Sequence, residues 1–203
     1  MHLMRGRWKL KAGYKIALLL GMAFAAPLKT TAQESRLPPQ LPAGALDVIN
    51  AAEGIRFNGP QDRRPDLQLV CDANCPYCAK LYVQLRDDFS EHAVRWVPIA
   101  YFKPDSATLA ARILSSGDPA AALDRNYRAY DFAERRGGYQ SSDGRAQMLD
   151  YEHEVLRQHW RDWGGYTPMI LAPDGQGQVY RARDTRPSSV RRLLEIAGGQ
   201  TGR

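Results

Sequence analysis

Three cysteines lie close together in the sequence, and two of them have the spacing of a redox pair. Cys75 and Cys78 enclose two residues in the segment CPYC. Thiol–disulfide exchange needs a thiolate that attacks and a second thiol that resolves the mixed disulfide. The sequence from Pro76 onward predicts a helix, so Cys75 lies at its N-terminus, where unpaired N–H groups should lower the pKa of the thiol. We expect Cys75, exposed at the helix tip, to attack, and Cys78, on the apolar helix face behind it, to resolve, with no bound cofactor and no metal.

The third cysteine, Cys71, fits more than one role. It alternates with Leu67 and Leu69 on one face of a predicted strand, which favours a small core residue. A regulatory disulfide with Cys75 is an alternative. The spacing C-x-x-x-C-x-x-C, with Tyr77 before the last cysteine, also matches the iron–sulfur motif of radical S-adenosylmethionine enzymes. An export signal and the short chain after the motif disfavour that alternative.

Other candidate sites in the sequence are weak. His153, Glu154 and His159 do not satisfy the zinc motif H-E-x-x-H, and the spacing of the two histidines turns them about 120° apart on a helix. The sequence has no phosphate loop, no G-x-S-x-G motif and no dinucleotide fingerprint. These observations leave the cysteines as the chemistry-bearing residues.

Residues 1–32 have the layout of a secretory signal peptide. Five basic residues precede the apolar stretch Ile16–Leu28, and small residues end the segment. The stretch is shorter than the roughly 20 residues of a membrane-spanning helix, which disfavours the alternative of a permanent anchor. We expect cleavage after Ala32, with Ala25 as the alternative site, and a protein that works in the oxidising periplasm.

The positive charge of the chain belongs largely to the same segment. Residues 1–32 hold six of the 28 basic residues and none of the 22 acidic ones, so the rest of the chain is close to neutral. A near-neutral protein gives no reason to expect nucleic acid or anionic lipid as a partner.

The order of the predicted helices and strands around the cysteines indicates an α/β domain at residues 55–203. A linker and short N-terminal segment at 33–54 precede it and include a predicted helix at 45–53. Apolar runs predict strands at 67–71 and 94–100 around the helix that begins at Pro76. The later elements are a helical insertion at about 104–165 with helices at 106–116, 119–136 and 144–160, a hairpin of strands at 168–172 and 178–182, and a helix at 187–198. Without the insertion, this is the element order of a thioredoxin-like fold.

Three segments resemble the bacterial periplasmic disulfide isomerase family that includes DsbC and DsbG. The first is CDANCPYCAKL, whose inner dipeptide Pro76-Tyr77 matches the DsbG catalytic domain. The second is KPDSATLAARILSSGDPAAAL, which is similar to the start of the helical insertion in DsbG. The third is Thr167-Pro168, ahead of the hairpin. The resemblance implies a thioredoxin-like fold with a cis Thr167–Pro168 bond facing the cysteines. It also implies that Thr167, Pro168, Pro76 and Tyr77 contact the substrate, because a cis bond before proline exposes backbone groups that pair with an extended segment.

The same resemblance implies a disulfide reductase or isomerase that acts on disulfides or sulfenic acids of exported cysteine-containing proteins. A membrane protein of DsbD or DsbB type would be its redox partner. Only residues 33–66 precede the strand at 67–71, too few for the dimerisation domain of DsbC and DsbG, so we expect a monomer or a weak dimer. The alternatives are a monomeric DsbA-like dithiol oxidase and a redox-inactive chaperone or binding module that keeps CPYC as a static disulfide.

Overall fold

The structure is a computed structural model that describes residues 37–140 and 148–199. Its strands are β1 (Ile55–Asn58), β2 (Leu67–Cys71), β3 (Val94–Pro98), β4 (Met169–Pro173) and β5 (Val179–Arg181). Its helices are α1 (Ala45–Ala51), α2 (Pro76–Asp88), α3 (Ser106–Leu114), α4 (Pro119–Arg128), α5 (Tyr151–Asp162) and α6 (Pro187–Gly198). The signal peptide predicted at residues 1–32 lies outside the described residues.

The described strands form one mixed sheet in the order β1-β3-β2-β4-β5. The central strands β2 and β3 are parallel, with the register Leu67 to Val94 through Cys71 to Pro98, because α2 connects them as a crossover helix. Strand β4 pairs antiparallel with β2, and the edge strands β1 and β5 pair antiparallel with β3 and β4. The expected α/β, thioredoxin-like architecture is confirmed.

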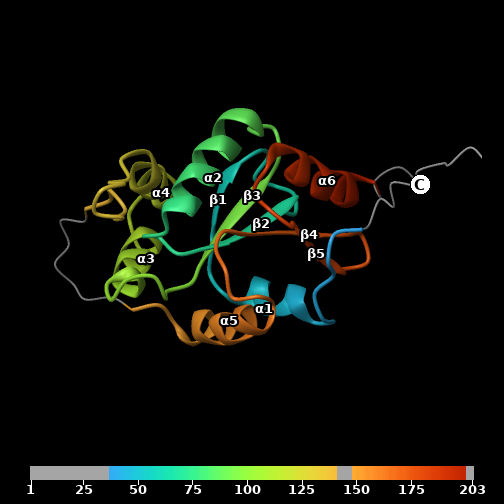
Figure 1. Cartoon of the computed structure of the whole chain (residues 1–203), viewed down its shortest axis with the longest axis horizontal. Helices are drawn as coiled ribbons and strands as arrows, with labels where there is room; N and C mark the ends of the chain where they lie inside the picture. The colour runs from blue at the N-terminus through green and yellow to red at the C-terminus, as the bar shows by residue number, and fades with distance from the viewer. Residues whose placement is uncertain (1–36, 141–147, 200–203) are drawn as a thin grey trace, which may run out of the picture. The chain divides into compact units, whose positions relative to one another are not determined.

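Helices cover both faces of the sheet (Figure 1). One core contains side chains of α2, α3, α4 and α6, including Leu85, packed against the sheet face that carries Leu69. The other core contains Ile49 of α1 and Leu156 of α5, packed against the face that carries Val70. Neighbouring residues of β2 point to opposite faces, as the period of two in a strand requires. Because both faces are covered, every side chain of β2 is buried.

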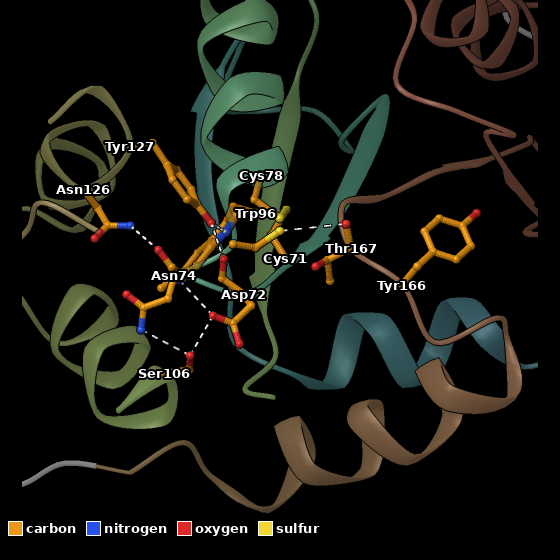
Figure 2. The surroundings of a disulfide bond; sticks show 12 residues. Cys71, Asp72, Asn74, Cys78, Trp96, Ser106, Asn126, Tyr127, Tyr166 and Thr167 are labelled. Carbon is orange, nitrogen blue, oxygen red and sulfur yellow. Dashed lines mark hydrogen bonds between the residues drawn. A yellow bond between two sulfur atoms is a disulfide. The ribbon is translucent and has the colours of Figure 1, made fainter. Parts of the chain in front are cut away.

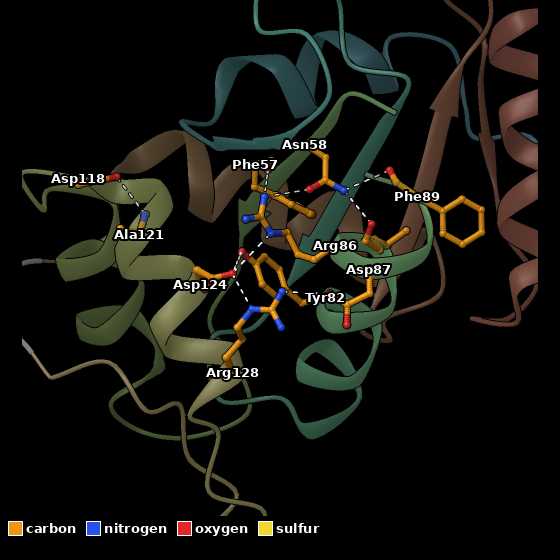
Figure 3. Close-up of polar contacts among 11 residues, drawn as sticks. Phe57, Asn58, Tyr82, Arg86, Asp87, Phe89, Asp118, Ala121, Asp124 and Arg128 are labelled. Atoms are coloured by element: carbon orange, nitrogen blue, oxygen red, sulfur yellow. Dashed lines mark hydrogen bonds and ion pairs between the residues drawn. The ribbon is translucent and has the colours of Figure 1, made fainter. Parts of the chain in front are cut away.

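Helix α2 is held in place by polar contacts as well as by its apolar face (Figure 3). The Tyr82 hydroxyl donates to the Asp124 carboxylate of α4 at 3.1 Å, and Arg86 lies 3.5 Å from the same carboxylate. At the other end, the Asn58 amide donates to the Leu85 carbonyl at 2.7 Å, in the last turn of the helix, where that carbonyl also accepts from the Phe89 N–H. These contacts fix α2 against β1 and α4, and so they fix the position of its N-terminus.

The structure confirms most of the elements predicted from the sequence and changes a few. Strand β1 was not predicted. In the insertion, α4 ends at Arg128 and α5 begins at Tyr151, so both helices are shorter than expected. Helices α3 and α4 pack on the same side of the sheet as α2, whereas α5 packs beside α1 on the other side. In the part of the chain that the structure describes, no helix is long and apolar enough to cross a membrane.

Candidate redox site

Cys75 lies where the chain passes from β2 into α2. A loop of three residues, Asp72 to Asn74, follows the strand, and Cys75 is the N-cap residue of α2 with an extended backbone. Pro76 occupies the first helical turn, where its missing N–H has no intrahelical acceptor to lose. The Cys75 side chain is only 2% exposed, so the expectation of a thiol exposed at the helix tip is wrong. Its neighbours must shift before a bulky substrate reaches the sulfur.

Cys71 forms a disulfide with Cys78, and Cys75 is a free thiol. The two bonded residues have a Cα–Cα separation of 6.0 Å, inside the range that a disulfide spans. Cys71 is fully buried on the strand face predicted for it, but the expectation that it only fills space is wrong, because its sulfur is bonded. The alternative of a disulfide between Cys71 and Cys75 is wrong for the same reason. The predicted pair of Cys75 and Cys78 stays a prediction.

The environment of Cys75 raises the pKa of its thiol. Burial is the largest cause, because it removes water from the charged form, and the nearby Asp72 charge acts in the same direction. Hydrogen bonds from the Thr167 side chain and from the backbone N–H groups of Cys78 and Tyr77 lower the pKa and offset part of this effect. We expected the helix N-terminus to lower the pKa. In this form of the protein burial outweighs it, and the Cys75 thiol is mainly protonated at neutral pH.

The peptide bond between Thr167 and Pro168 is cis and faces Cys75. The Cys75 thiol lies 3.8 Å from the Thr167 carbonyl oxygen, which accepts its hydrogen bond. Tyr101, in the loop after β3, places its hydroxyl 2.6 Å from the Thr167 hydroxyl. The Tyr101 ring in turn packs on Trp160 of α5, with ring centroids 4.7 Å apart. Thr167 is therefore held between the free thiol and an aromatic pair.

The carboxylate of Asp72 organises the loop before Cys75 (Figure 2). One of its oxygens accepts hydrogen bonds from the Asn74 N–H and the Ser106 hydroxyl, each at 2.8 Å. The other oxygen accepts from the N–H groups of Tyr101 and Phe102, also at 2.8 Å. A buried carboxylate is tolerated when its lone pairs are used in this way. Asp72 thus ties the cysteine loop to the loop after β3 and to the start of α3.

The insertion clamps the same loop from the other side. The Asn126 amide of α4 donates to the Ala73 carbonyl at 2.9 Å, and the Tyr130 hydroxyl donates to the Asn74 carbonyl at 2.5 Å. The Asn74 side chain accepts from the Gly137 N–H at 3.0 Å. The carbonyls of Ala73 and Asn74 thus both find donors in the insertion. The insertion is therefore part of the scaffold of the site.

An open pocket of about 250 Å³ lies beside the cis bond. Its lining includes Tyr77, Tyr166, Thr167 and Pro168. Tyr77 is 66% exposed, so its ring is accessible to a ligand in the pocket. The predicted substrate contacts Thr167, Pro168 and Tyr77 thus border one pocket, next to the loop that carries Cys75.

Sequence reasoning missed the polar residues that support the site. Asp72, Asn74, Tyr101 and Ser106 were not among the predicted site residues. An acidic residue directly after a largely apolar strand was a usable signal, because such a carboxylate must find several donors. In the described parts of the chain, no cluster of three or more His, Cys, Asp or Glu side chains could hold a metal ion.

Comparison with known proteins supports the fold. No family model and no curated protein matches the chain. Among solved structures, the chain is similar to a disulfide interchange protein from Neisseria gonorrhoeae, with 17% identity over 75% of this chain and 97% of that chain and a TM-score of 0.51. It is also similar to ScsC of Proteus mirabilis in a compact conformation, with 22% identity over 81% and 82% of the two chains and a TM-score of 0.50.

DsbG of Helicobacter pylori is a weaker match, with 20% identity over 68% of this chain and 59% of that chain and a TM-score of 0.42. Identities at this level show the fold alone. The chain has the thioredoxin-like fold found in disulfide interchange proteins, and the comparisons do not single out DsbC or DsbG within that group.

Proposed function

We propose that this protein is a periplasmic thiol–disulfide oxidoreductase in which Cys75 attacks and Cys78 resolves. One observation carries the proposal: the free Cys75 thiol at the N-cap of α2 lies beside the cis Thr167–Pro168 bond. The Cys75 sulfur is 3.8 Å from the Thr167 carbonyl oxygen. A thiol there attacks while the adjacent backbone holds an extended substrate segment. The reaction needs no bound cofactor, because cysteine sulfurs carry both electrons.

The proposed reaction has two exchange steps. The Cys75 thiolate attacks a substrate disulfide, forms a mixed disulfide and releases one substrate thiolate, which takes up a proton. The Cys78 thiolate then attacks the Cys75 sulfur of the mixed disulfide, releases the second substrate thiolate and leaves a Cys75–Cys78 disulfide. The substrate gains two electrons and two protons. With a sulfenic acid as substrate, the first step forms the same mixed disulfide and releases water.

The environment of the two sulfurs supports this order. Cys78 is completely buried, so an external disulfide reaches it less readily than it reaches Cys75, which keeps 2% of its surface exposed. The N–H groups of Cys78 and Tyr77 donate to the Cys75 sulfur and stabilise its thiolate when it forms. Because burial raises the pKa of Cys75, attack should speed up as the pH rises toward that pKa.

The substrates we propose are exported proteins that contain cysteines, with a membrane protein of DsbD or DsbB type as redox partner. The pocket beside Pro168 supports an extended peptide as ligand, with the exposed Tyr77 ring as one wall. Within the group of disulfide interchange proteins we place the chain nearest to the DsbG catalytic domain, because of the Pro76-Tyr77 dipeptide. We propose that it acts as a reductase or isomerase, as a monomer or weak dimer.

A second candidate function is a redox-inactive chaperone or binding module. The completely buried disulfide between Cys71 and Cys78 favours this candidate, since a bond without exposed sulfur resists exchange. A DsbA-like dithiol oxidase uses the same residues in the reverse direction. Trapping the thiols in intact cells separates oxidase from reductase, because a mainly reduced protein indicates a reductase or isomerase.

Reduction of insulin in the presence of a dithiol tests the proposed function. We expect the wild-type protein to accelerate precipitation of the insulin B chain and the Cys75→Ser variant to lose that acceleration. Serine is a good N-cap residue, so this variant should fold. Equal activity of wild type and variant would contradict the proposal. A wild-type protein that is inactive, and whose thiol count does not change with a mild reductant, would support the binding module.

A further inference from the structure

We propose that Cys71 is a third catalytic thiol that displaces Cys75 from its disulfide with Cys78. One disulfide then exchanges between the Cys75–Cys78 and the Cys71–Cys78 pairings. The inference rests on the proposed function and deepens it. In this scheme the two-electron oxidised protein has two forms. One form holds the disulfide next to the substrate pocket, and the other holds it in the core and returns Cys75 to a free thiol.

The positions of the three residues support the exchange. Cys78 lies in the first turn of α2, three residues after Cys75, a spacing that puts two side chains on the same side of a helix. Cys75 is the N-cap residue of the same helix, so it lies next to the first turn that carries Cys78. On its other side, the Cys78 sulfur is bonded to Cys71 at the end of β2. Cys78 therefore has a partner toward the surface and a partner toward the sheet.

The register of β2 explains why Cys71 can reach the helix. Cys71 is the last residue of β2 and shares its strand face with Leu69, the face that packs against α2. Asp72 then turns the chain, and α2 runs back over this face. The end of the strand and the first helical turn are thus brought together, with Cα atoms 6.0 Å apart. A cysteine at the preceding position would point to the opposite core.

The exchange balances without an outside oxidant. The Cys71 thiolate attacks the Cys78 sulfur of the Cys75–Cys78 disulfide, the sulfur–sulfur bond to Cys75 breaks, and Cys75 leaves as a thiolate. One disulfide breaks, one forms, and no electrons leave the protein. The proton lost by the Cys71 thiol is balanced by the proton that Cys75 gains. Burial of Cys75, which raises its pKa, favours this protonated product.

The consequence is a change from dithiol to monothiol chemistry. In the Cys71–Cys78 form, Cys75 can form a mixed disulfide with a substrate, but no free Cys78 thiol is ready to resolve it. Such a mixed disulfide persists until another thiol of the substrate attacks it, which is the step that rearranges disulfides instead of reducing them. The core disulfide is shielded, because of the three cysteines only Cys75 keeps any exposed surface. Electrons should therefore enter the core disulfide through Cys75.

Mapping the single free thiol of the oxidised protein tests the proposal. The full mature chain is reduced, oxidised with oxidised glutathione, quenched in acid and alkylated after unfolding. Fragmentation of the peptide that contains all three cysteines then locates the alkyl group. We expect the label on both Cys71 and Cys75, which reports both disulfide forms. Label on Cys71 alone would overturn the proposal and leave the proposed function intact, whereas failure of glutathione to oxidise any cysteine pair would contradict both.

The route of electrons is tested with Cys75→Ser. Dithiothreitol should reduce the Cys71–Cys78 disulfide of this variant at a rate about tenfold or more below the wild-type rate, because the exchange through Cys75 is absent. Equal rates would overturn the proposed route. Cys71→Ala is the control for the thiol count: without the exchange, its oxidised form should hold only the Cys75–Cys78 disulfide and have no free thiol. Thiol count and insulin activity thus separate a failure of the exchange from a failure of the redox site.

Discussion

The buried carboxylate of Asp72 should control both the stability of the domain and the reactivity of Cys75. Asp72→Asn keeps the shape of the side chain but replaces one acceptor oxygen with an N–H₂ group. Each oxygen accepts two hydrogen bonds, so either orientation of the amide loses two of the four. The Ser106 hydroxyl cannot readily turn round to accept, because the Lys103 N–H and the Asn74 amide already donate to it.

The magnitude follows from the number of bonds lost. A hydrogen bond to a charged group contributes about 1.5–3 kcal/mol, so losing two should lower the free energy of unfolding by about 3–6 kcal/mol. That is a large part of the free energy of unfolding of a whole domain, which is roughly 5–15 kcal/mol. The Asp72 charge also raises the pKa of Cys75, so its removal should lower that pKa and speed the reaction of Cys75 with iodoacetamide at neutral pH.

The assays are urea unfolding followed by circular dichroism, and the rate of alkylation of Cys75 in the folded protein. Asp118→Asn is the matched control, because Asp118 caps α4 by accepting from the Ala121 N–H at 3.0 Å at an exposed position. Asparagine caps nearly as well as aspartate, so the control should change stability by less than about 0.5 kcal/mol. Equal stability of the Asp72→Asn and Asp118→Asn variants would refute the reasoning.

Further predictions concern the pKa of Cys75 and one tight turn. In the Cys71–Cys78 form, alkylation of Cys75 should increase with pH to an inflection above that of free cysteine, because burial raises the pKa. Thr167→Val removes a hydrogen bond that lowers this pKa, and for each unit that the pKa rises, the attack at neutral pH should slow about threefold, since lost thiolate exceeds gained nucleophilicity. An unchanged pH profile would contradict this role of Thr167. Gly59→Ala should cost about 1–3 kcal/mol of stability in urea unfolding, because Gly59 has φ +64° and a Cβ there would lie 2.5 Å from the Ala93 nitrogen. Gly117→Ala, where a Cβ meets no atom within 4 Å, is its control, and an equal effect at both glycines would contradict the packing argument.

Local patterns predicted the elements that carry the site. The apolar run of β2, the helical spacing after Pro76, the hairpin of β4 and β5 and the start of α6 depend on residues near one another in sequence, so they were found. Strand β1 was missed because an edge strand of four residues carries little periodic signal. Helix α5 begins only at Tyr151, because the Asp150 side chain accepts from the His153 N–H and caps it there.

The site itself was predicted only in part, because its geometry depends on residues far apart in sequence. The cysteines and Thr167-Pro168 were chosen as residues, but the bond from Cys71 to Cys78 depends on how α2 packs against the end of β2. The pKa of Cys75 could not be predicted from the helix N-terminus alone, since burial by surrounding segments decides its direction. The donors to Asp72 come from a loop after β3 and from α3, which no local pattern brings together.

Trapping a substrate on the protein tests most directly whether Cys75 is the attacking residue. In Cys78→Ser, the mixed disulfide formed by attack has no resolving thiol and accumulates. After incubation with a peptide disulfide and quenching in acid, mass spectrometry of the cysteine-containing peptide locates the adduct. We predict the adduct on Cys75, at the N-cap of α2 beside the Thr167 carbonyl. An adduct on Cys71, or no adduct while the variant is folded, would contradict the account.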